Sequence, residues 1–238
     1  MRILALAIVQ LVIILLLNSC ATFQRHLWRL QEPNGKSPAS GLFAYSDKYF
    51  YYDTHDGSLN FLVPQHGTTT KHSLHVRCEL REFTPEGKPA AWVLDQAPTL
   101  HFSGMVTLLG GGPRGRTTLA QVFDASADKP LAELEFRATR WTNQFQLCLM
   151  VKHSPQGKHS TFYVLGPAHL RERYTITLSL HHESLVVSLG SHQEAFPIEA
   201  SFKKDQFYFK VGNYDQTTSK GTPGVLYTHV KVYSLNLT

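Results

Sequence analysis

The sequence lacks several features that would place it in a class at once. With 17% charged and 42% hydrophobic residues it has too little charge and too many apolar residues for a disordered chain, and its three cysteines are too few for a disulfide-rich scaffold. Beyond the N-terminus no segment has a sustained helical repeat of apolar residues. Its 23 Lys and Arg against 18 Asp and Glu are unclustered, so we expect no nucleic-acid partner.

The first 20 residues differ from the rest of the chain. Arg2 precedes an apolar run over residues 3–17 that is interrupted by one polar residue, a pattern typical of a secretory signal peptide and too short for a membrane span. The segment Leu-Asn-Ser-Cys ending at Cys20 resembles a bacterial lipobox, in which the cysteine is lipidated. We therefore predict an exported outer-membrane lipoprotein anchored through Cys20. Ordinary cleavage near Ala21, giving a periplasmic or secreted protein, is the alternative.

The remaining chain divides into a short linker and one domain. Residues 21–41 lack periodicity and are rich in Pro, Gly and Ser, so we predict a tether there and a folded domain at 42–238. Strand-like segments separated by turn residues recur through that domain, and we predict strands at residues 59–63, 74–82, 99–109, 117–123, 131–138, 144–152, 160–165, 174–181, 185–189, 206–211 and 226–235. Eleven short strands without helices indicate an all-β sandwich or jelly roll.

Two cysteines, Cys78 and Cys148, fall within these predicted strands. A buried thiol packs as a small hydrophobic group, and spacing along the chain does not show proximity in space. We favour two buried free thiols, with a disulfide as the alternative.

One predicted strand carries alternating charges. In Arg-Cys-Glu-Leu-Arg-Glu at residues 77–82, the two-residue period places Arg77, Glu79 and Arg81 on one face. Two guanidinium groups beside one carboxylate suit an anionic ligand, although a row of exposed ion pairs is the ordinary explanation of such a hexapeptide.

Two later strands add polar and aromatic groups. Gln121 and Phe123 share one face of the first. The second, near the C-terminus, directs three side chains to one side: Tyr208, Lys210 and Tyr214. Gly212 between them leaves room for a close approach of another strand.

Together these segments carry a family resemblance. Arg-x-Glu-Leu-Arg-Glu from residue 77, Gln-Val from residue 121 and Tyr-Phe-Lys-x-Gly-x-Tyr-x-Gln from residue 208 resemble, in that order, the motifs of alginate lyases of polysaccharide lyase family 7. The resemblance runs from about Gly57 to the C-terminus. It implies a concanavalin-like jelly roll with a concave groove, and β-elimination on an acidic polysaccharide, alginate or glucuronan, without a metal or other cofactor. We also expect a monomer.

The resemblance implies roles for the matching residues. Removing a proton next to a carboxylate drives negative charge onto that group, so donors must be aimed at it. Arg77 and Gln121 match the positions that neutralise the carboxylate, and Tyr214 matches the catalytic tyrosine, base and then acid. Six further residues would bind neighbouring sugars or hold Arg77 in place: Glu79, Arg81, Lys210, Tyr208, Phe123 and Gln216.

Phe123 departs from the pattern, because relatives usually have a histidine there. Phenylalanine cannot act as a base, although it can stack on a sugar ring. In mannuronate and glucuronate the C5 proton and the C4 oxygen lie on the same side, so one tyrosine can serve both steps; in guluronate they do not. We therefore predict a preference for mannuronate-rich alginate. The alternatives are a glucuronan lyase and a non-catalytic polyuronate-binding lipoprotein.

A glycine-rich segment, Gly-Gly-Gly-Pro-Arg-Gly-Arg-Thr at residues 110–117, imitates a phosphate-binding loop. No helix is predicted after it, and Pro113 suits a hairpin connection between strands. We predict a loop at the rim of the groove.

Overall fold

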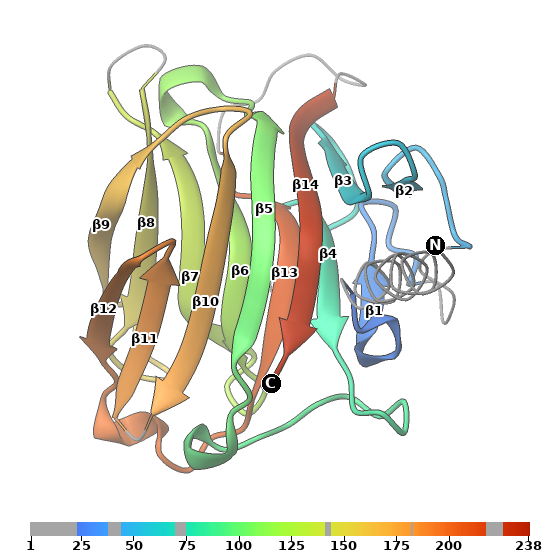
Figure 1. Ribbon diagram of the computed structural model, residues 1–238. Helices are drawn as coiled ribbons and strands as arrows, with labels where there is room; N and C mark the ends of the chain where they lie inside the picture. The colour runs from blue at the N-terminus through green and yellow to red at the C-terminus, as the bar shows by residue number, and fades with distance from the viewer. Residues whose placement is uncertain (1–22, 38–43, 70–74, 141–143, 182, 218–225) are drawn as a thin grey trace, which may run out of the picture.

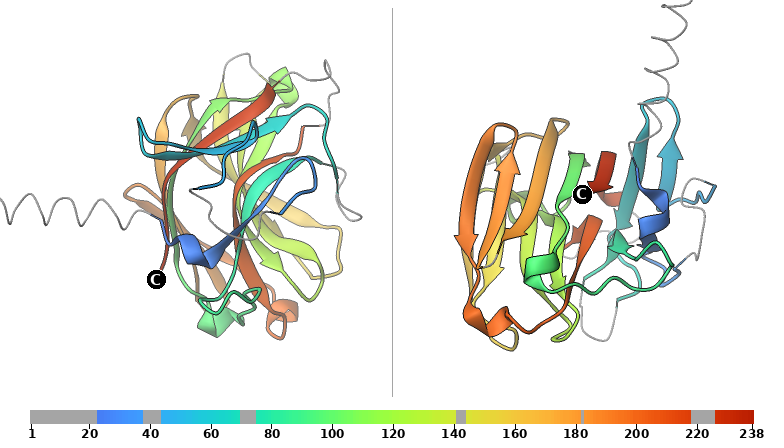
Figure 2. Two further views of the ribbon diagram at one scale, coloured as in Figure 1. Left: turned by 90° about the vertical axis from the view of Figure 1, so that its right-hand side faces the viewer. Right: turned by 60° about the horizontal axis from the view of Figure 1, so that its bottom comes forward.

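The computed structural model describes residues 23–37, 44–69, 75–140, 144–181, 183–217 and 226–238. Over these residues the chain forms two antiparallel seven-stranded sheets packed face to face (Figure 1). Figure 2 gives two further views of the two layers. The predicted signal peptide and Cys20 lie outside the described residues. Within the described residues, no helix has the length and apolar character needed to cross a membrane.

One sheet, which we term the site sheet, has the strand order β1-β4-β13-β6-β7-β8-β9. Its strands are β1 (Trp28–Gln31), β4 (Arg77–Glu82), β13 (Phe207–Asp215), β6 (Arg116–Asp124), β7 (Lys129–Ala138), β8 (Phe145–Lys152) and β9 (Ser160–Ala168). The three motif-bearing strands β4, β13 and β6 are therefore direct neighbours, although they are far apart in the sequence.

The other sheet, the covering sheet, has the order β12-β11-β10-β5-β14-β3-β2. Its strands are β12 (His192–Pro197), β11 (Ser184–Leu189), β10 (Arg173–His181), β5 (Leu100–Leu108), β14 (Leu226–Leu237), β3 (Ser58–Pro64) and β2 (Phe50–Asp53). Four short 3-10 turns complete the described structure: η1 (Arg25–Leu27), η2 (Leu94–Gln96), η3 (Gly112–Arg114) and η4 (Ala200–Phe202).

The hydrophobic core lies between the sheets and follows the two-residue period of the strands. In β13, Phe207, Phe209 and Val211 are buried in the core, while the side chains between them belong to the opposite face. Burying one such side chain contributes about 1.5 to 3 kcal/mol to the free energy of folding. The inward residues thereby hold the outward ones in register.

All eleven predicted strands are present, with small differences at their ends. Three strands, β1, β2 and β12, were not predicted. β1 and β2 have four residues each, too few to show a period, and β12 is an edge strand whose side chains are mostly exposed. The predicted fold class, an all-β sandwich of the jelly-roll type, is confirmed.

The predicted tether at 21–41 is wrong in one part. Residues 28–31 form β1, which pairs with β4, and Trp28 and Leu30 are fully buried. The folded domain therefore begins before residue 42. The turn-forming residues that suggested a linker follow this first strand.

Gly212 brings β13 and β4 unusually close. The register between β13 and β6 shifts between Val211 and Tyr214. A Cβ atom added to Gly212 would lie 2.7 Å from the Cα of Glu79, closer than real Cβ contacts allow. The expected close approach is confirmed, and it sets Tyr214 directly opposite Arg77.

Cys78 and Cys148 are both buried and free. The expectation of two buried thiols is confirmed.

Candidate active site

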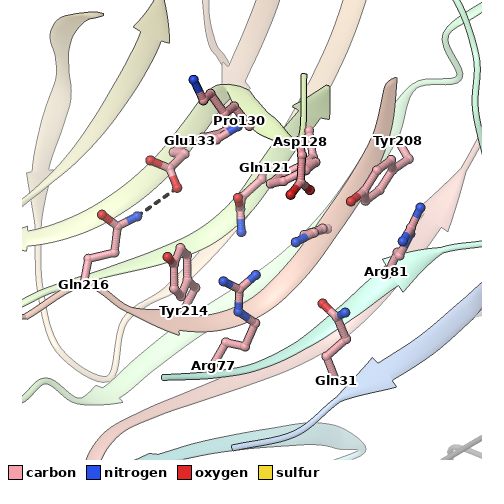
Figure 3. A pocket seen from close by; sticks show the side chains of 13 residues that line it. Gln31, Arg77, Arg81, Gln121, Asp128, Pro130, Glu133, Tyr208, Tyr214 and Gln216 are labelled. Atoms are coloured by element: carbon pink, nitrogen blue, oxygen red, sulfur yellow. Dashed lines mark hydrogen bonds between the residues drawn. The ribbon is translucent and has the colours of Figure 1, made fainter. Parts of the chain in front are cut away.

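A pocket of about 370 Å³ opens on the outer face of the site sheet (Figure 3). Five strands contribute to it: β1, β4, β6, β7 and β13. Every predicted sugar-site residue except Glu79 lines the pocket: Arg77, Arg81, Gln121, Phe123, Tyr208, Lys210, Tyr214 and Gln216. The fold thus brings the three sequence motifs into one site.

Glu79 lies beneath the pocket and joins three of these residues. Its side chain is 2% exposed. Oε1 lies 3.1 Å from Arg77 Nη1 and 3.2 Å from Lys210 Nζ. Oε2 accepts a hydrogen bond from Gln121 Nε2 at 2.8 Å. Glu79 therefore holds one group from each motif, a wider set of contacts than the single Arg77 contact expected from the sequence.

The charges of this cluster do not balance. Arg77 and Lys210 share one carboxylate, so one positive charge remains for a ligand. Burial lowers the pKa of Lys210, and Glu79 only partly opposes this effect. Burial acts in the same direction on Arg77, but there the attraction of Glu79 outweighs it and raises the pKa of the guanidinium. A buried excess of positive charge is costly unless an anion compensates it.

Tyr214 lies against this cluster. The Arg77 guanidinium carbon is 4.3 Å from the centre of the Tyr214 ring. Figure 3 shows the two side chains next to each other, both directed into the pocket. A cation in this position favours the ionised form of a phenol and also binds the ring face.

Phe123 and Tyr208 form an aromatic wall of the pocket. Their ring centres are 5.2 Å apart. Lys210 Nζ lies 4.1 Å from the Phe123 ring, and the Arg81 guanidinium lies 4.0 Å from the Tyr208 ring. Burial raises the pKa of Tyr208, which keeps its phenol neutral. Phe123 is only 9% exposed, so its main contacts are with Lys210 and Tyr208.

Two residues at the site were missed by the sequence analysis. His75 lies just before β4, and its ring centre is 6.1 Å from that of Tyr214 at an interplanar angle of 74°. Burial, followed by the positive charge of Arg116, lowers the pKa of His75, although Asp215 opposes the shift. The two-residue period extended backwards from Arg77 would have found His75.

Glu133 on β7 is the second missed residue. It is buried in the pocket wall, and its Oε1 accepts a hydrogen bond from Gln216 Nε2 at 2.8 Å (Figure 3). Burial, and then the nearby Glu135 and Glu79, raise the pKa of Glu133 to about 8. No sequence signal marks it, because it becomes a site residue only through the pairing of β7 with β6 opposite Gln121.

No group of three or more His, Cys, Asp or Glu side chains is placed to hold a metal ion in the described part of the chain.

A family model described as alginate lyase matches residues 24–238. The chain belongs to the alginate lyase family. It is therefore a polysaccharide lyase, and the resemblance found in the sequence motifs is confirmed. No curated protein matches the lyase by sequence.

Solved structures resemble the lyase over most of its length. Alginate lyase A1-II', a member of polysaccharide lyase family 7, has 25% identity and a TM-score of 0.78, covering 92% of this chain and 97% of its own. A tyrosine-to-phenylalanine variant of that enzyme, solved with the product GGG, has 26% identity and a TM-score of 0.77 over 91% and 96%. An alginate lyase from Pseudomonas aeruginosa has 20% identity and a TM-score of 0.78 over 90% and 99%, which shows a shared fold.

Proposed function

We propose that this lyase cleaves mannuronate-rich alginate by β-elimination, with Tyr214 as the base that takes the C5 proton. The observation that carries this proposal is the contact of Arg77 with Tyr214 above a buried cluster with excess positive charge. The same cluster suits the carboxylate of a uronate sugar.

The reaction divides among the pocket residues as follows. Tyr214, as phenolate, takes the C5 proton while Arg77 and Gln121 donate hydrogen bonds to the adjacent carboxylate as its negative charge grows. The electron pair of the broken C5–H bond forms the C4=C5 double bond, and the C4–O bond breaks. The departing oxygen receives a proton from Tyr214, which restores the phenolate. Glu79 keeps Arg77 and Gln121 in position through its two oxygens.

The preference for mannuronate rests on Phe123. This residue lines the pocket where a second base would stand, and its ring packs on Lys210. With Tyr214 as the proton-transferring group, a substrate whose C5 proton and C4 oxygen lie on one side is favoured. Glucuronan shares that geometry and is the alternative substrate. Variants of the related A1-II' enzyme have been solved with the product GGG and with the substrate GGMG.

Substrate preference is tested by following the absorbance of the unsaturated product on poly-mannuronate, poly-guluronate and glucuronan. We expect turnover of poly-mannuronate or glucuronan to exceed that of poly-guluronate. Fastest turnover of poly-guluronate would contradict the assignment.

The catalytic role of Tyr214 is tested with Tyr214→Phe. Loss of a general base and acid lowers turnover about 100- to 10,000-fold. Affinity for an uncleaved polymer should stay within about threefold, because the cations remain. A wild-type protein that binds polyuronate but releases no unsaturated product would favour the non-catalytic binding protein instead.

The place of action is proposed from the sequence. The apolar N-terminal run and the Leu-Asn-Ser-Cys segment support export and lipid attachment at Cys20, with ordinary secretion as the alternative. We also propose a monomer. Mass spectrometry of the mature N-terminus tests the first point, since an unmodified terminus at or after Ala21 would exclude the anchor. Light scattering of the purified domain tests the second.

A further inference from the structure

A second pocket, of about 550 Å³, lies beside the first and is lined by four arginines. We term it the arginine pocket: Arg114, Arg116, Arg137 and Arg140. The glycine-rich segment supplies Arg114 and Arg116, and the end of β7 with the residues after it supplies Arg137 and Arg140.

The arginine pocket shares a face of the site sheet with Tyr214. In β13 and β6, Tyr214 pairs with Thr118, so Thr118 and Arg116, two residues earlier, lie on the Tyr214 side. In β7, Glu133 and Arg137 are four residues apart and so lie on the same face of the sheet. Glu133 is in the wall of the first pocket, and Arg137 pairs with Arg116. The two pockets are therefore neighbouring parts of one outer surface.

Hydrogen bonds to Gln216 and Thr217 fix Arg116 next to the active site. Its carbonyl accepts a hydrogen bond from Gln216 N at 3.0 Å, and its Nε donates to Gln216 O at 3.2 Å. Its amide donates to Thr217 Oγ1 at 3.2 Å. Gly111 packs so closely against Thr217 that an added Cβ would collide with it. The loop expected at the groove rim is thus tied to the strand that carries Tyr214.

The arginine pocket has more positive charge than its own acids neutralise. Among the ion pairs within the described residues, only that between Arg137 Nε and Glu135 Oε2, at 3.3 Å, involves these arginines. Arg114 and Arg140 are exposed. Four guanidinium groups against one paired carboxylate leave an excess suited to several anionic groups.

An exposed aromatic ring lies on the same face. Phe162 of β9 is 46% exposed, and the Arg137 guanidinium lies 4.8 Å from its ring centre. Phe162 pairs with Met150, which pairs with Glu133, so its side chain is on the pocket side of the sheet. The exposed Phe162 ring beside Arg137 gives this face an apolar surface next to a cation, and a uronate sugar offers both an apolar face and a carboxylate.

We propose that the arginine pocket continues the substrate groove beyond Tyr214 and binds the carboxylates of a longer stretch of the same polyuronate chain. The inference rests on the proposed function and adds a binding region that short substrates do not reach. Along a strand, residues 116 and 121 are about 17 Å apart, so only chains of several sugars can occupy both pockets.

The test compares Arg114→Ala/Arg140→Ala with the wild type on a defined trimannuronate and on the polymer. Both arginines are exposed and neither belongs to the catalytic set. We expect kcat/KM on the polymer to fall about three- to tenfold, with turnover of the trimer within twofold of wild type. The fall should shrink at high salt, because exposed charges are screened. Equal loss on both substrates, or no loss on the polymer, would overturn the inference.

Two further variants separate charge from structure. Arg114→Lys/Arg140→Lys keeps the charge and should recover most of the polymer activity. Lys88→Ala/Lys204→Ala removes two exposed charges outside the pocket, so its polymer activity should match wild type. A similar loss in this control would mean that net charge, not this pocket, attracts the polymer.

Binding measured in a Tyr214→Phe background makes the test independent of turnover. The ratio of the affinity for long mannuronate chains to the affinity for the trimer should fall when Arg114 and Arg140 are replaced. Sulfate and phosphate test whether the pocket is a simple anion site. If either ion at millimolar concentration reproduces the affinity change caused by the arginine substitutions, and that change does not depend on chain length, the polymer assignment fails. If wild type shows no lyase activity but the length dependence persists, the proposed function fails and the binding region stands.

Discussion

Two lysine–carboxylate clusters, one in each sheet, show how differently this fold treats charge. In the site sheet the Lys210 side chain is 4% exposed and its partner Glu79 2%. In the covering sheet Lys231 is 17% exposed and pairs with Asp56 at 2.6 Å and Asp53 at 3.6 Å. Burial prevails at Lys210 and lowers its pKa, whereas at Lys231 the attraction of Asp56 outweighs burial and raises it.

The comparison shows that the Lys210 cluster, unlike the Lys231 cluster, has a charge balance that favours ligand binding over stability of the free protein. The Lys231 cluster lies near solvent and sets two carboxylates, Asp53 and Asp56, against one cation. The Lys210 cluster buries two cations against one carboxylate. The uncompensated charge destabilises the free protein, and a bound anion would offset this cost. A site of this kind is expected to be stabilised by its ligand more than by its own contacts.

Removing the carboxylate at the centre of the site should have the largest effect. Glu79→Gln leaves Arg77 and Lys210 buried without a counter-charge, so we expect a loss of about 3 to 5 kcal/mol in the free energy of unfolding. Turnover should fall by roughly 100-fold or more, since Arg77 and Gln121 lose their support. Urea unfolding and initial rates measure the two effects. A Glu79→Gln variant with near wild-type unfolding free energy and turnover would contradict the proposed role of Glu79.

Replacing each lysine by methionine gives a matched pair. For Lys210→Met we expect unfolding free energy that is unchanged or up to about 1 kcal/mol higher, because a desolvated charge is removed and Arg77 still pairs with Glu79. Its turnover should fall about 100-fold. Lys231→Met should lose up to about 1 kcal/mol and keep full turnover. Equal behaviour of the two variants in stability and activity would contradict the contrast.

His75 is expected to act as a positioning residue for Tyr214. His75→Gln keeps a polar side chain of similar size but cannot be protonated, so we expect turnover to fall roughly tenfold and the acidic limb of the pH profile to flatten. The surface variant His153→Gln serves as control. A merely structural role would lower turnover equally at all pH values, and that result would reject the assignment.

Glu133 should give a smaller, pH-dependent effect on stability. An unfolded Glu133 loses its proton near pH 4.5, but the folded one keeps it until about pH 8, so its contribution to stability declines as pH rises through that window. Glu133→Gln should be more stable than wild type at pH 9, by at least about 1 kcal/mol, and equal to it near pH 4. Thermal unfolding across pH measures this. A difference that does not vary with pH would show that Glu133 is not protonated in the fold.

The faces of the motif strands were predictable because side-chain direction in a strand is a local property. Arg77, Glu79 and Arg81 alternate with buried Cys78 and Leu80 as the two-residue period requires. The same holds for the core-facing residues of β13. Short or exposed strands such as β1 and β12 gave no such pattern. Because β1 was missed, the domain boundary at residue 42 was placed too late.

The neighbours of each side chain were not predictable in this way, since strand order is set by contacts between distant segments. Glu79 and Gln121 are 42 residues apart in sequence, yet share a hydrogen bond. The raised pKa of Glu133, the contact of His75 with Tyr214 and the gathering of four arginines from two separate segments all depend on which strands lie side by side. The sequence by itself determined the strands, their outward faces and the family motifs. Only the tertiary structure decided which charges are buried together, because burial and electrostatic coupling are properties of the packed sheet.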